Sequence, residues 1–569
     1  MKSNNLYTDK IFLIILLLIL LLLSLFLMNE KRSWNGDEII TYSMANNQDG
    51  GFVFSNGKVG KYYDEYIYSE SFAKMSKNVI NTVCDVITNG RNAAYFRMEP
   101  PRESGWFSKA EINKIFQVED GTRFDFINVY KNSMSDESHS FLYYMSIHLI
   151  SSLFKEGNSD SKWCAYIFNL LMICILMFFS SKTAVLLGVS HKPAAFFGFI
   201  GGLCHTFLSM LTVERDYVFC SAGVIVQSYL LLSLLKSEAK DRKRWFICIF
   251  LVNITGFWFA YLMTVYTISL FLVWLIIILK NRTDFRFLRD FILVYIFSGI
   301  TALAVWPVSV FGCLSKLSND IQNGEEKSFI QIVMRSIQEL CLFYTDGKII
   351  FGVLLFLILI IFTFVLLNTN GFGIQMEWFY LIIASLIAAL FTGCLMGSFY
   401  VGRIASAFIF SICGIIYDVI KAGKKKWMSI AVISVSFLAS ALNINSATQS
   451  IRSDNSMFER YYQISEQYEN MPVMYIRSYK GNYLMTRFLG KASEVLVVTL
   501  PNSSLNDYLQ DEKLVNSDEI LVYVDNNEKI RLDTDTFLNA MGFSKITDLC
   551  KGTICENGDM RLLSAKRIG

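Results

Sequence analysis

Long apolar runs alternate with short polar stretches over the first 442 residues of the chain. A helix needs about 20 apolar residues to cross a bilayer. The run 246–279 would be roughly 51 Å long as one helix, so we expect two spans with a break near 256–261. Further spans are predicted near 11–28, 163–180, 194–212, 218–235, 291–313, 349–367, 378–397, 401–420 and 427–442. The pattern therefore predicts about eleven transmembrane helices.

The segment 141–154 is apolar over a shorter length, which is typical of re-entrant or interfacial segments. We expect it not to span; counting it as a span is the alternative, and would put one basic loop on the outer side. Lys and Arg mark cytoplasmic loops, so the basic loops 236–244, 280–289 and 421–426 are placed in the cytoplasm, with the weaker loop 181–192. The N-terminus is then cytoplasmic, and the first loop (29–162) is extracytoplasmic.

The pattern changes after residue 442, where short β-rich runs alternate with helical patterns. The β-rich runs are 472–476, 494–500, 519–524 and 560–564, and the helical patterns are 457–468 and 536–541. This alternation predicts a small α/β domain, here extracytoplasmic, over 443–569. The fold class is therefore an all-α polytopic membrane domain (1–442) with a small α/β domain. Cys550 and Cys555 lie close together in this domain, and if it faces an oxidising compartment, a local disulfide and two free thiols are the alternatives.

The composition is typical of a membrane protein, and it argues against nucleic-acid binding and ion-coupled transport as functions. The chain is 53% hydrophobic and 18% charged, against about 25% charged in soluble proteins. A net charge of +3 gives no reason to expect a nucleic-acid partner. Ion-coupled transporters usually place ionisable groups near the membrane midplane, and the apolar cores here hold almost none. No metal-ligand spacing occurs in the polar segments, so neither a metal nor a cofactor is expected.

Charged residues gather instead where the spans meet the outer face. Asp37 and Glu38 follow the first span by a few residues, and a carboxylate there can act as general base on an acceptor hydroxyl. The structural alternative is a helix start, in which acidic residues cap the first turn.

Two further clusters lie at the same face. His139, Tyr143 and Tyr144 begin the short apolar segment, where tyrosine suits a membrane interface. His148, further along that segment, is interpreted as a packed core histidine.

The turn 213–217 carries Arg215 and Tyr217 between two spans, and Arg403 opens a later span. Arginine is permanently charged and forked, so it suits a phosphate. A salt-bridged turn and a snorkelling side chain are the structural alternatives for these arginines.

The order of these motifs resembles the C-type (GT-C) membrane glycosyltransferases, in the bacterial protein O-mannosyltransferase and aminoarabinose transferase branch. An acidic pair follows the first helix, then His139-Ser-Phe-Leu-Tyr143-Tyr144, then Ser161-Lys-Trp163 with Asn169, and later an Arg-x-Tyr turn. The resemblance covers about 11–289, and the later spans more loosely. The family has His-Pro-Pro where this chain has His139-Ser-Phe, and Val213 takes the place of an acidic residue before Arg215.

The resemblance implies a polyprenyl-phosphate sugar donor and an inverting transfer to an extracytoplasmic acceptor. Asp37 would be the catalytic base, and Glu38 would orient the acceptor or the sugar. Arg215 and Arg403 would stabilise the phosphate that leaves, and the cluster His139, Tyr143, Tyr144 would line the site with Tyr217. The acceptor would be a glycan, a lipid or a protein of the cell envelope.

Two other functions stay open on the sequence. One is a membrane transporter or lipid-linked glycan flippase without transferase chemistry. The other is a non-catalytic scaffold that presents the C-terminal domain.

Overall fold

The computed structural model describes the chain in two compact units, each built from several stretches of sequence. The first, called the helical unit, takes Met1–Glu30, Ser138–Tyr143 and Ala165–Ser450, and the second, called the loop–sheet unit, takes Lys31–Glu137, Tyr144–Cys164 and Ile451–Gly569. The residues described are 2–48, 71–89, 104–134, 139–155, 160–281, 284–309, 329–344, 375–395, 397–423, 426–478, 485–500, 504–525, 528–551 and 560–567.

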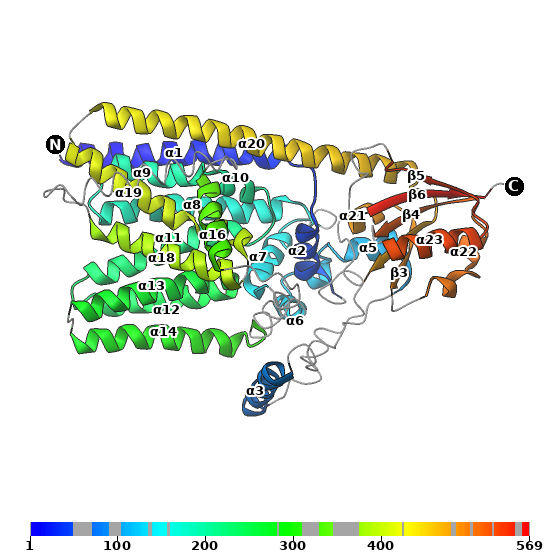
Figure 1. Cartoon of the computed structure of the whole chain (residues 1–569), viewed down its shortest axis with the longest axis horizontal. Helices are drawn as coiled ribbons and strands as arrows, with labels where there is room; N and C mark the ends of the chain where they lie inside the picture. The colour runs from blue at the N-terminus through cyan, green and yellow to red at the C-terminus, as the bar shows by residue number, and fades with distance from the viewer. Residues whose placement is uncertain are drawn as a thin grey trace. The chain divides into compact units, whose positions relative to one another are not determined.

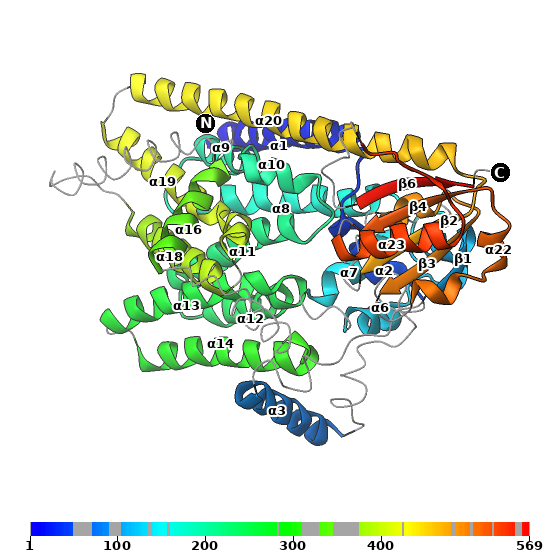
Figure 2. The ribbon, with the colours of Figure 1, turned by 45° about the vertical axis from the view of Figure 1, so that its right-hand side comes forward.

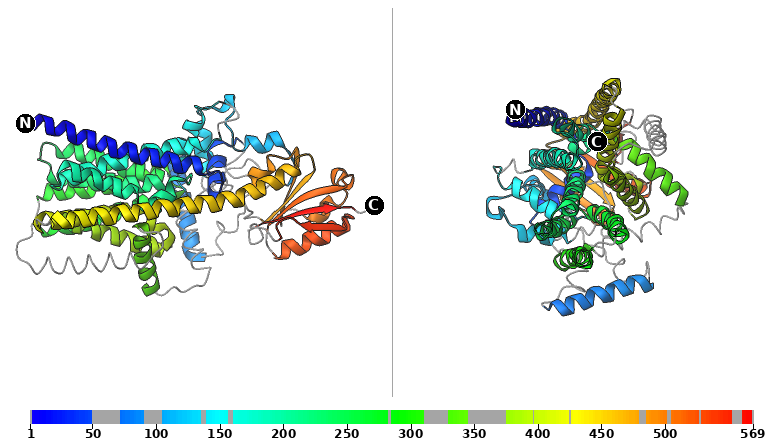
Figure 3. Two further views of the ribbon diagram at one scale, coloured as in Figure 1. Left: turned by 90° about the horizontal axis from the view of Figure 1, so that it is seen from above. Right: turned by 90° about the vertical axis from the view of Figure 1, so that its left-hand side faces the viewer.

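The helical unit consists of apolar helices that pack against one another (Figure 1). They are α1 (Lys2–Glu30), α8 (Trp163–Leu186), α9 (His191–Gly202), α10 (His205–Leu211), α11 (Tyr217–Lys236), α12 (Arg242–Phe259), α13 (Tyr261–Lys280), α14 (Phe285–Val305), α16 (Phe329–Tyr344), α18 (Met376–Leu395), η4 (Ser398–Ile404) and α19 (Ser406–Gly423). The 42-residue helix α20 (Lys426–Gln467, yellow in Figure 3) contributes its residues up to Ser450 to this unit and those from Ile451 to the other.

Within the described residues, 6 helices are long and apolar enough to cross a membrane, and a bent pair would make 7. They are α1, α8, α11, α13, α14 and α18. Helices α12, α19 and α20 cover three more predicted spans, whereas the predicted span 349–367 lies outside the described residues. The chain is a multi-pass membrane protein.

The long apolar run 246–279 divides as predicted. Helix α12 ends at Phe259 and α13 begins at Tyr261, with Ala260 between them in an extended conformation (φ −157°). The run is too long to cross a bilayer as one helix. The break divides it into helices of 18 and 20 residues, each about the length of one crossing.

The predicted span 194–212 is different, because α9 and α10 meet at a bend of 65°. Gly201 and Gly202 end α9, and glycine pairs weaken a helix at this kind of kink. Gly202 also lies against α1, where an added Cβ would come within 2.5 Å of Leu20 Cδ2. Close packing on α1 thus explains the glycine at the bend.

The loop–sheet unit holds short helices and a 6-stranded sheet (Figure 2). Its helices are α2 (Gly36–Asn46), α3 (Phe72–Asn89), α5 (Lys109–Lys114), η3 (Asp120–Thr122), α6 (Phe126–Ser133), α7 (Phe141–Ser151, beginning in the helical unit), α21 (Met485–Leu489), η5 (Leu505–Tyr508), α22 (Glu512–Val515) and α23 (Glu528–Ala540). At 11 residues, α7 is too short to cross a bilayer as one helix.

The sheet confirms four predicted strands and adds two. The predicted runs became β2 (Val473–Ser478), β3 (Glu494–Leu500), β4 (Glu519–Asp525) and β6 (Met560–Lys566), and β5 (Lys545–Asp548) is new. The order is β1-β3-β2-β4-β6-β5, with β3, β2 and β4 parallel. Its apolar core includes Leu496, Val522 and Phe537 of α23.

The sixth strand comes from the first loop rather than from the C-terminal segment. Strand β1 (Gly105–Ser108) pairs antiparallel with β3, so that Trp106 lies opposite Leu496 and Phe107 opposite Val495. The first loop and the segment after α20 therefore share one sheet. Cys555, one of the two cysteines considered for a disulfide, lies outside the described residues.

Candidate active site

Helix α2 places the acidic pair, and its N-terminus is built by a capping box. The Asn35 side chain accepts from Glu38 N, and Glu38 Oε2 accepts from Asn35 N, each at 2.9 Å. Asp37 is exposed in the first turn, where the helix dipole favours a carboxylate. The two adjacent acids therefore lie in different surroundings, with Asp37 exposed to solvent and Glu38 turned back to cap the helix.

Glu38 is fully buried and forms an ion pair with Lys31, which is also buried. The carboxyl group of Asp454, an exposed residue of α20 in the same unit, interacts electrostatically with both of them. Burial raises the pKa of Asp454, the neighbouring Lys31 lowers it, and Glu38 raises it further. The Lys31–Glu38 ion pair thus anchors the segment before α2, and the charges of both residues act on Asp454 of α20.

Two cations, Lys162 and Arg487, contact the ring of Trp34 just ahead of Asp37, and we call this arrangement the Trp34 clamp. Lys162 Nζ lies 4.7 Å and Arg487 Cζ 4.1 Å from the Trp34 ring centroid. Arg487 also forms an ion pair with Asp160. Cation–π contacts of this kind fix the ring in place.

Further hydrogen bonds tie the same segment to the residues before α8. Lys162 donates to the Ser33 carbonyl, and Tyr42 donates to the Ser161 carbonyl at 2.7 Å. Tyr42 also meets the Trp34 ring edge-on at 5.6 Å. Asp37 is therefore carried on a helix start that is held on several sides.

Sequence reasoning missed most of this clamp. Lys162 lies within the Ser161-Lys-Trp163 stretch that contributed to the family resemblance, which was a usable signal. Arg487 had none, because its partner Trp34 is distant in sequence and belongs to a different stretch of the unit.

His139, Tyr143 and Tyr144 surround the start of α7. The half-buried His139 accepts a hydrogen bond from Tyr261 through its carbonyl at 3.3 Å. Tyr143 is buried and meets Phe168 edge-on at 5.5 Å, and Tyr144 is fully buried. His148 is also buried, with Nδ1 3.2 Å from Asn46 Oδ1, so its interpretation as a packed core histidine agrees with the structure.

Arg403 and Tyr217 meet within the helical unit. The Arg403 Cζ lies 3.4 Å from the Tyr217 ring centroid and 4.1 Å from that of Tyr400, and the side chain is almost fully buried. Ser221 donates to the Arg403 carbonyl at 3.1 Å, and Ser406 donates to the Ser221 carbonyl at 2.7 Å. The guanidinium is thus covered by tyrosine rings, and its backbone is fastened to α11.

The turn before α11 is held by Asn169 of α8. Its amide donates to the Leu211 carbonyl at 3.0 Å and to the Val213 carbonyl at 3.4 Å. Glu214 and Arg215 in this turn are both buried, 0% and 2% exposed. Arg215 therefore sits inside the protein, two positions before Tyr217, rather than on a solvated turn.

The predicted site residues thus form two groups. Arg215, Tyr217 and Arg403 belong to the helical unit with His139 and Tyr143, and Asp37, Glu38 and Tyr144 belong to the loop–sheet unit. In the part of the chain that the structure describes, no cluster of three or more His, Cys, Asp or Glu side chains could hold a metal ion.

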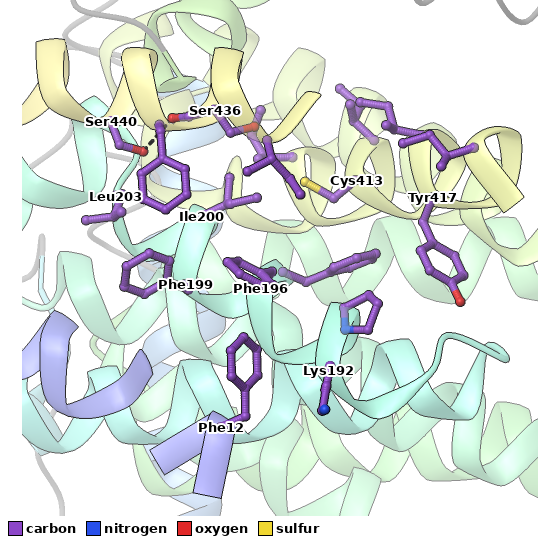
Figure 4. A pocket seen from close by; sticks show the side chains of 18 residues that line it. Phe12, Lys192, Phe196, Phe199, Ile200, Leu203, Cys413, Tyr417, Ser436 and Ser440 are labelled. Carbon is purple, nitrogen blue, oxygen red and sulfur yellow. Dashed lines mark hydrogen bonds between the residues drawn. The ribbon is translucent and has the colours of Figure 1, made fainter. Parts of the chain in front are cut away.

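An apolar pocket of about 400 Å³ lies elsewhere in the helical unit, between α1, α9, α19 and α20 (Figure 4). Phe12, Phe196, Phe199 and Leu203 contribute to its walls, and Lys192 lies at its edge. Such walls offer contacts for hydrocarbon rather than an acid–base pair. This pocket is therefore distinct from the candidate active site.

Comparisons with known proteins return structural similarity alone. No protein-family model and no curated protein matches the chain. ArnT from Cupriavidus metallidurans bound to undecaprenyl phosphate is 11% identical, with a TM-score of 0.45 over 75% of this chain and 88% of that one. The same protein in the apo state is 10% identical, with a TM-score of 0.47 over 75% and 87%.

TM-scores below 0.5 mark a distant similarity, and we therefore base the function on this chain's own residues.

Proposed function

We propose that this protein is an inverting membrane glycosyltransferase that uses a polyprenyl-phosphate sugar donor at the extracytoplasmic face. The observation that carries the proposal is the contrast between two adjacent acids. Asp37 is exposed on a firmly held helix start, a few residues after α1 ends at Glu30, whereas Glu38 beside it is buried in an ion pair. A carboxylate presented in this way suits a general base for a lipid-borne reaction.

In the proposed reaction, the acceptor hydroxyl oxygen attacks the anomeric carbon of the donor sugar. Asp37 takes the hydroxyl proton as the new carbon–oxygen bond forms. The bond from the anomeric carbon to the phosphate oxygen breaks on the opposite face, and polyprenyl phosphate leaves with that electron pair. One displacement of this kind inverts the anomeric configuration.

Arg403 is the proposed phosphate ligand, with Arg215 as a second cation. The rings of Tyr217 and Tyr400 contact the guanidinium, and a permanently charged, forked group of this kind suits a phosphate. Preorganised donors of this kind stabilise the charge that develops on a leaving phosphate.

The remaining predicted residues take supporting roles. Glu38 has Lys31 and the Asn35 N–H as partners, so we propose that it holds the Asp37 segment in addition to any contact with the acceptor or the sugar. His139, Tyr143 and Tyr144 are proposed to line the site. The acceptor is proposed to be a glycan, lipid or protein of the cell envelope.

Asp37→Asn tests the proposal. The variant keeps the size of the side chain, and Thr41 still bonds to the backbone carbonyl of residue 37. We expect transfer from a polyprenyl-phosphate sugar in proteoliposomes to fall by at least about 100-fold, the usual contribution of a general base. The matched control is Asp120→Asn, which changes an exposed carboxylate of the same loop and should leave transfer unchanged.

Two results would contradict the proposal. Full transfer by Asp37→Asn would remove the base. Vesicles in which both variants move a lipid-linked glycan across the membrane, with no glycosylated product, would support the flippase alternative instead.

A further inference from the structure

A groove between α12 and α14 combines cations at one end with an apolar floor along its length. It encloses about 760 Å³. Helices α12 and α14 pack side by side in the helical unit, with α14 at the edge of that unit (Figures 1 and 2). Both helices begin at the basic loops, so the two stretches of cations meet at the same end of the groove.

The cations at that end are Arg242, Lys243 and Arg286. Within the described part of the chain, neither Lys243 nor Arg286 makes an ion pair with a carboxylate. Arg242 lies over the Phe287 ring at 4.8 Å, and its Nε is buried without a hydrogen-bond partner in the described residues. The guanidinium is therefore held by the ring while part of its hydrogen-bonding capacity goes unused.

Two carboxylates line the same end, and both are already engaged. Asp284 caps α14 by accepting from Arg286 N at 3.1 Å. Asp290 accepts from Arg289 Nε and Nη2 at 3.0 and 2.8 Å. The three cations outnumber these two carboxylates, one of which pairs with Arg289, so the end of the groove keeps a net positive charge.

Away from the cations the groove is apolar and open to the side. Phe246, Ile247 and Phe250 of α12 face Leu293 and Val294 of α14 across it. Helix α14 exposes much of its surface, with only 17% of its most apolar stretch buried. A helix this apolar and this exposed must face hydrocarbon.

We propose that this groove binds one anionic glycerophospholipid, with its phosphate among the three cations and its acyl chains along the apolar floor. Charge complementarity selects an anionic headgroup, and basic pockets between transmembrane helices on the cytoplasmic side bind such headgroups. The loops that supply the cations are the ones that the excess of Lys and Arg places in the cytoplasm. A glycerophospholipid of the inner leaflet is therefore the occupant, because the phosphate of the proposed sugar donor would lie at the other face.

The test uses the full-length protein in nanodiscs of phosphatidylcholine with an increasing fraction of phosphatidylglycerol. Native mass spectrometry after release counts retained lipids. Wild-type protein should retain one phosphatidylglycerol in preference to phosphatidylcholine. In the triple variant R242Q/K243Q/R286Q that preference should fall roughly fivefold or more, as expected for loss of several cation contacts.

The matched control removes three cations that lie near the same membrane face but do not line the groove, as K240Q/R244Q/K280Q. It should keep the preference of the wild type. An equal loss in both triple variants would overturn the proposal, because it would show attraction by the basic face as a whole.

Ile247→Trp provides a second variant that leaves every cation in place. A larger side chain at this exposed position fills the apolar floor, so lipid retention should fall while the melting temperature stays close to that of the wild type. Retention of phosphatidylglycerol by this variant would overturn the proposed path of the acyl chains. Displacement of phosphatidylglycerol by an equal mole fraction of undecaprenyl phosphate would overturn the proposed occupant.

Discussion

At the scale of single residues, Asp37 and Glu38 show how neighbouring acids acquire different properties. Successive residues of a helix lie about 100° apart around its axis, so one acid can face solvent while the next faces the interior. Glu38 is buried and paired with Lys31, which removes two charges from water at a cost. In return, the ion pair holds the start of the helix that carries Asp37.

Replacing only one partner of the Lys31–Glu38 ion pair should destabilise the fold more than replacing both partners. Glu38→Gln leaves Lys31 as a buried cation, and we expect the free energy of unfolding to fall by about 3 kcal/mol. The double variant K31M/E38Q leaves no such cation, so it should lose less. Thermal unfolding in detergent, followed by tryptophan fluorescence, measures both. A double variant as unstable as the sum of the two single changes would show that the residues are not coupled.

Asp454 should make the stability depend on pH in the same region. Its pKa is raised, chiefly by burial, so the folded state binds a proton more tightly than the unfolded chain does. Stability therefore decreases as the pH rises from about 4 through the raised pKa. Asp454→Asn removes this titration, and the variant should melt higher than the wild type at pH 7 but equally at about pH 4. A constant difference between the two melting curves at all pH values would contradict this.

At the scale of elements, strand β1 shows what a local pattern does and does not predict. Strands β2, β3 and β4 have long apolar runs, because parallel strands buried on both faces read that way. The antiparallel strand β6 is also largely buried, and the sequence located all four. Strands β1 and β5 have only 4 residues each, too short for a period to be recognised. The pairing of β1 with β3 joins segments distant in sequence, which local patterns do not reveal.

By pairing with β3, strand β1 should protect the backbone amides of β3 from hydrogen exchange. Trp106 packs on the sheet core and donates to Asp511 at 2.8 Å. Trp106→Ala should lower the free energy of unfolding of this unit by about 3 kcal/mol and speed amide exchange in β3, its direct partner. Phe107→Ala is the control, since successive strand residues face opposite sides of a sheet. Unchanged exchange in residues 494–500 of Trp106→Ala would mean that β1 does not protect β3.

At the scale of the whole molecule, the sequence predicted the succession of spans and the sheet better than the site. Span positions follow from hydropathy along the chain, and the break at Ala260 follows from length alone. The contact of Arg403 with Tyr217 depends on the packing of η4 on α11, although both residues were predicted for one site. The clamp on Trp34 combines three stretches of the loop–sheet unit, and a reading of local motifs finds only one of its cations.

The orientation of the chain is the prediction on which the proposed chemistry depends, and it rests on loop charge. The loop 236–244 holds five cations and two carboxylates, so it should face the cytoplasm. A protease site inserted after Lys240 should resist protease added outside right-side-out vesicles, whereas one inserted after Gly121 in the first loop should be cut. The same site after Gly569 should also be cut, and detergent should expose all three.

Cleavage after Lys240 in intact vesicles, with protection after Gly121, would reverse this orientation. The first loop carries Asp37, so the proposed base would then face the cytosol, where an acceptor in the cell envelope is out of reach. Residue 37 would still be exposed on its helix, but the reaction would need a different acceptor. Protection at Gly121 would therefore contradict the proposed function while leaving the described fold unchanged.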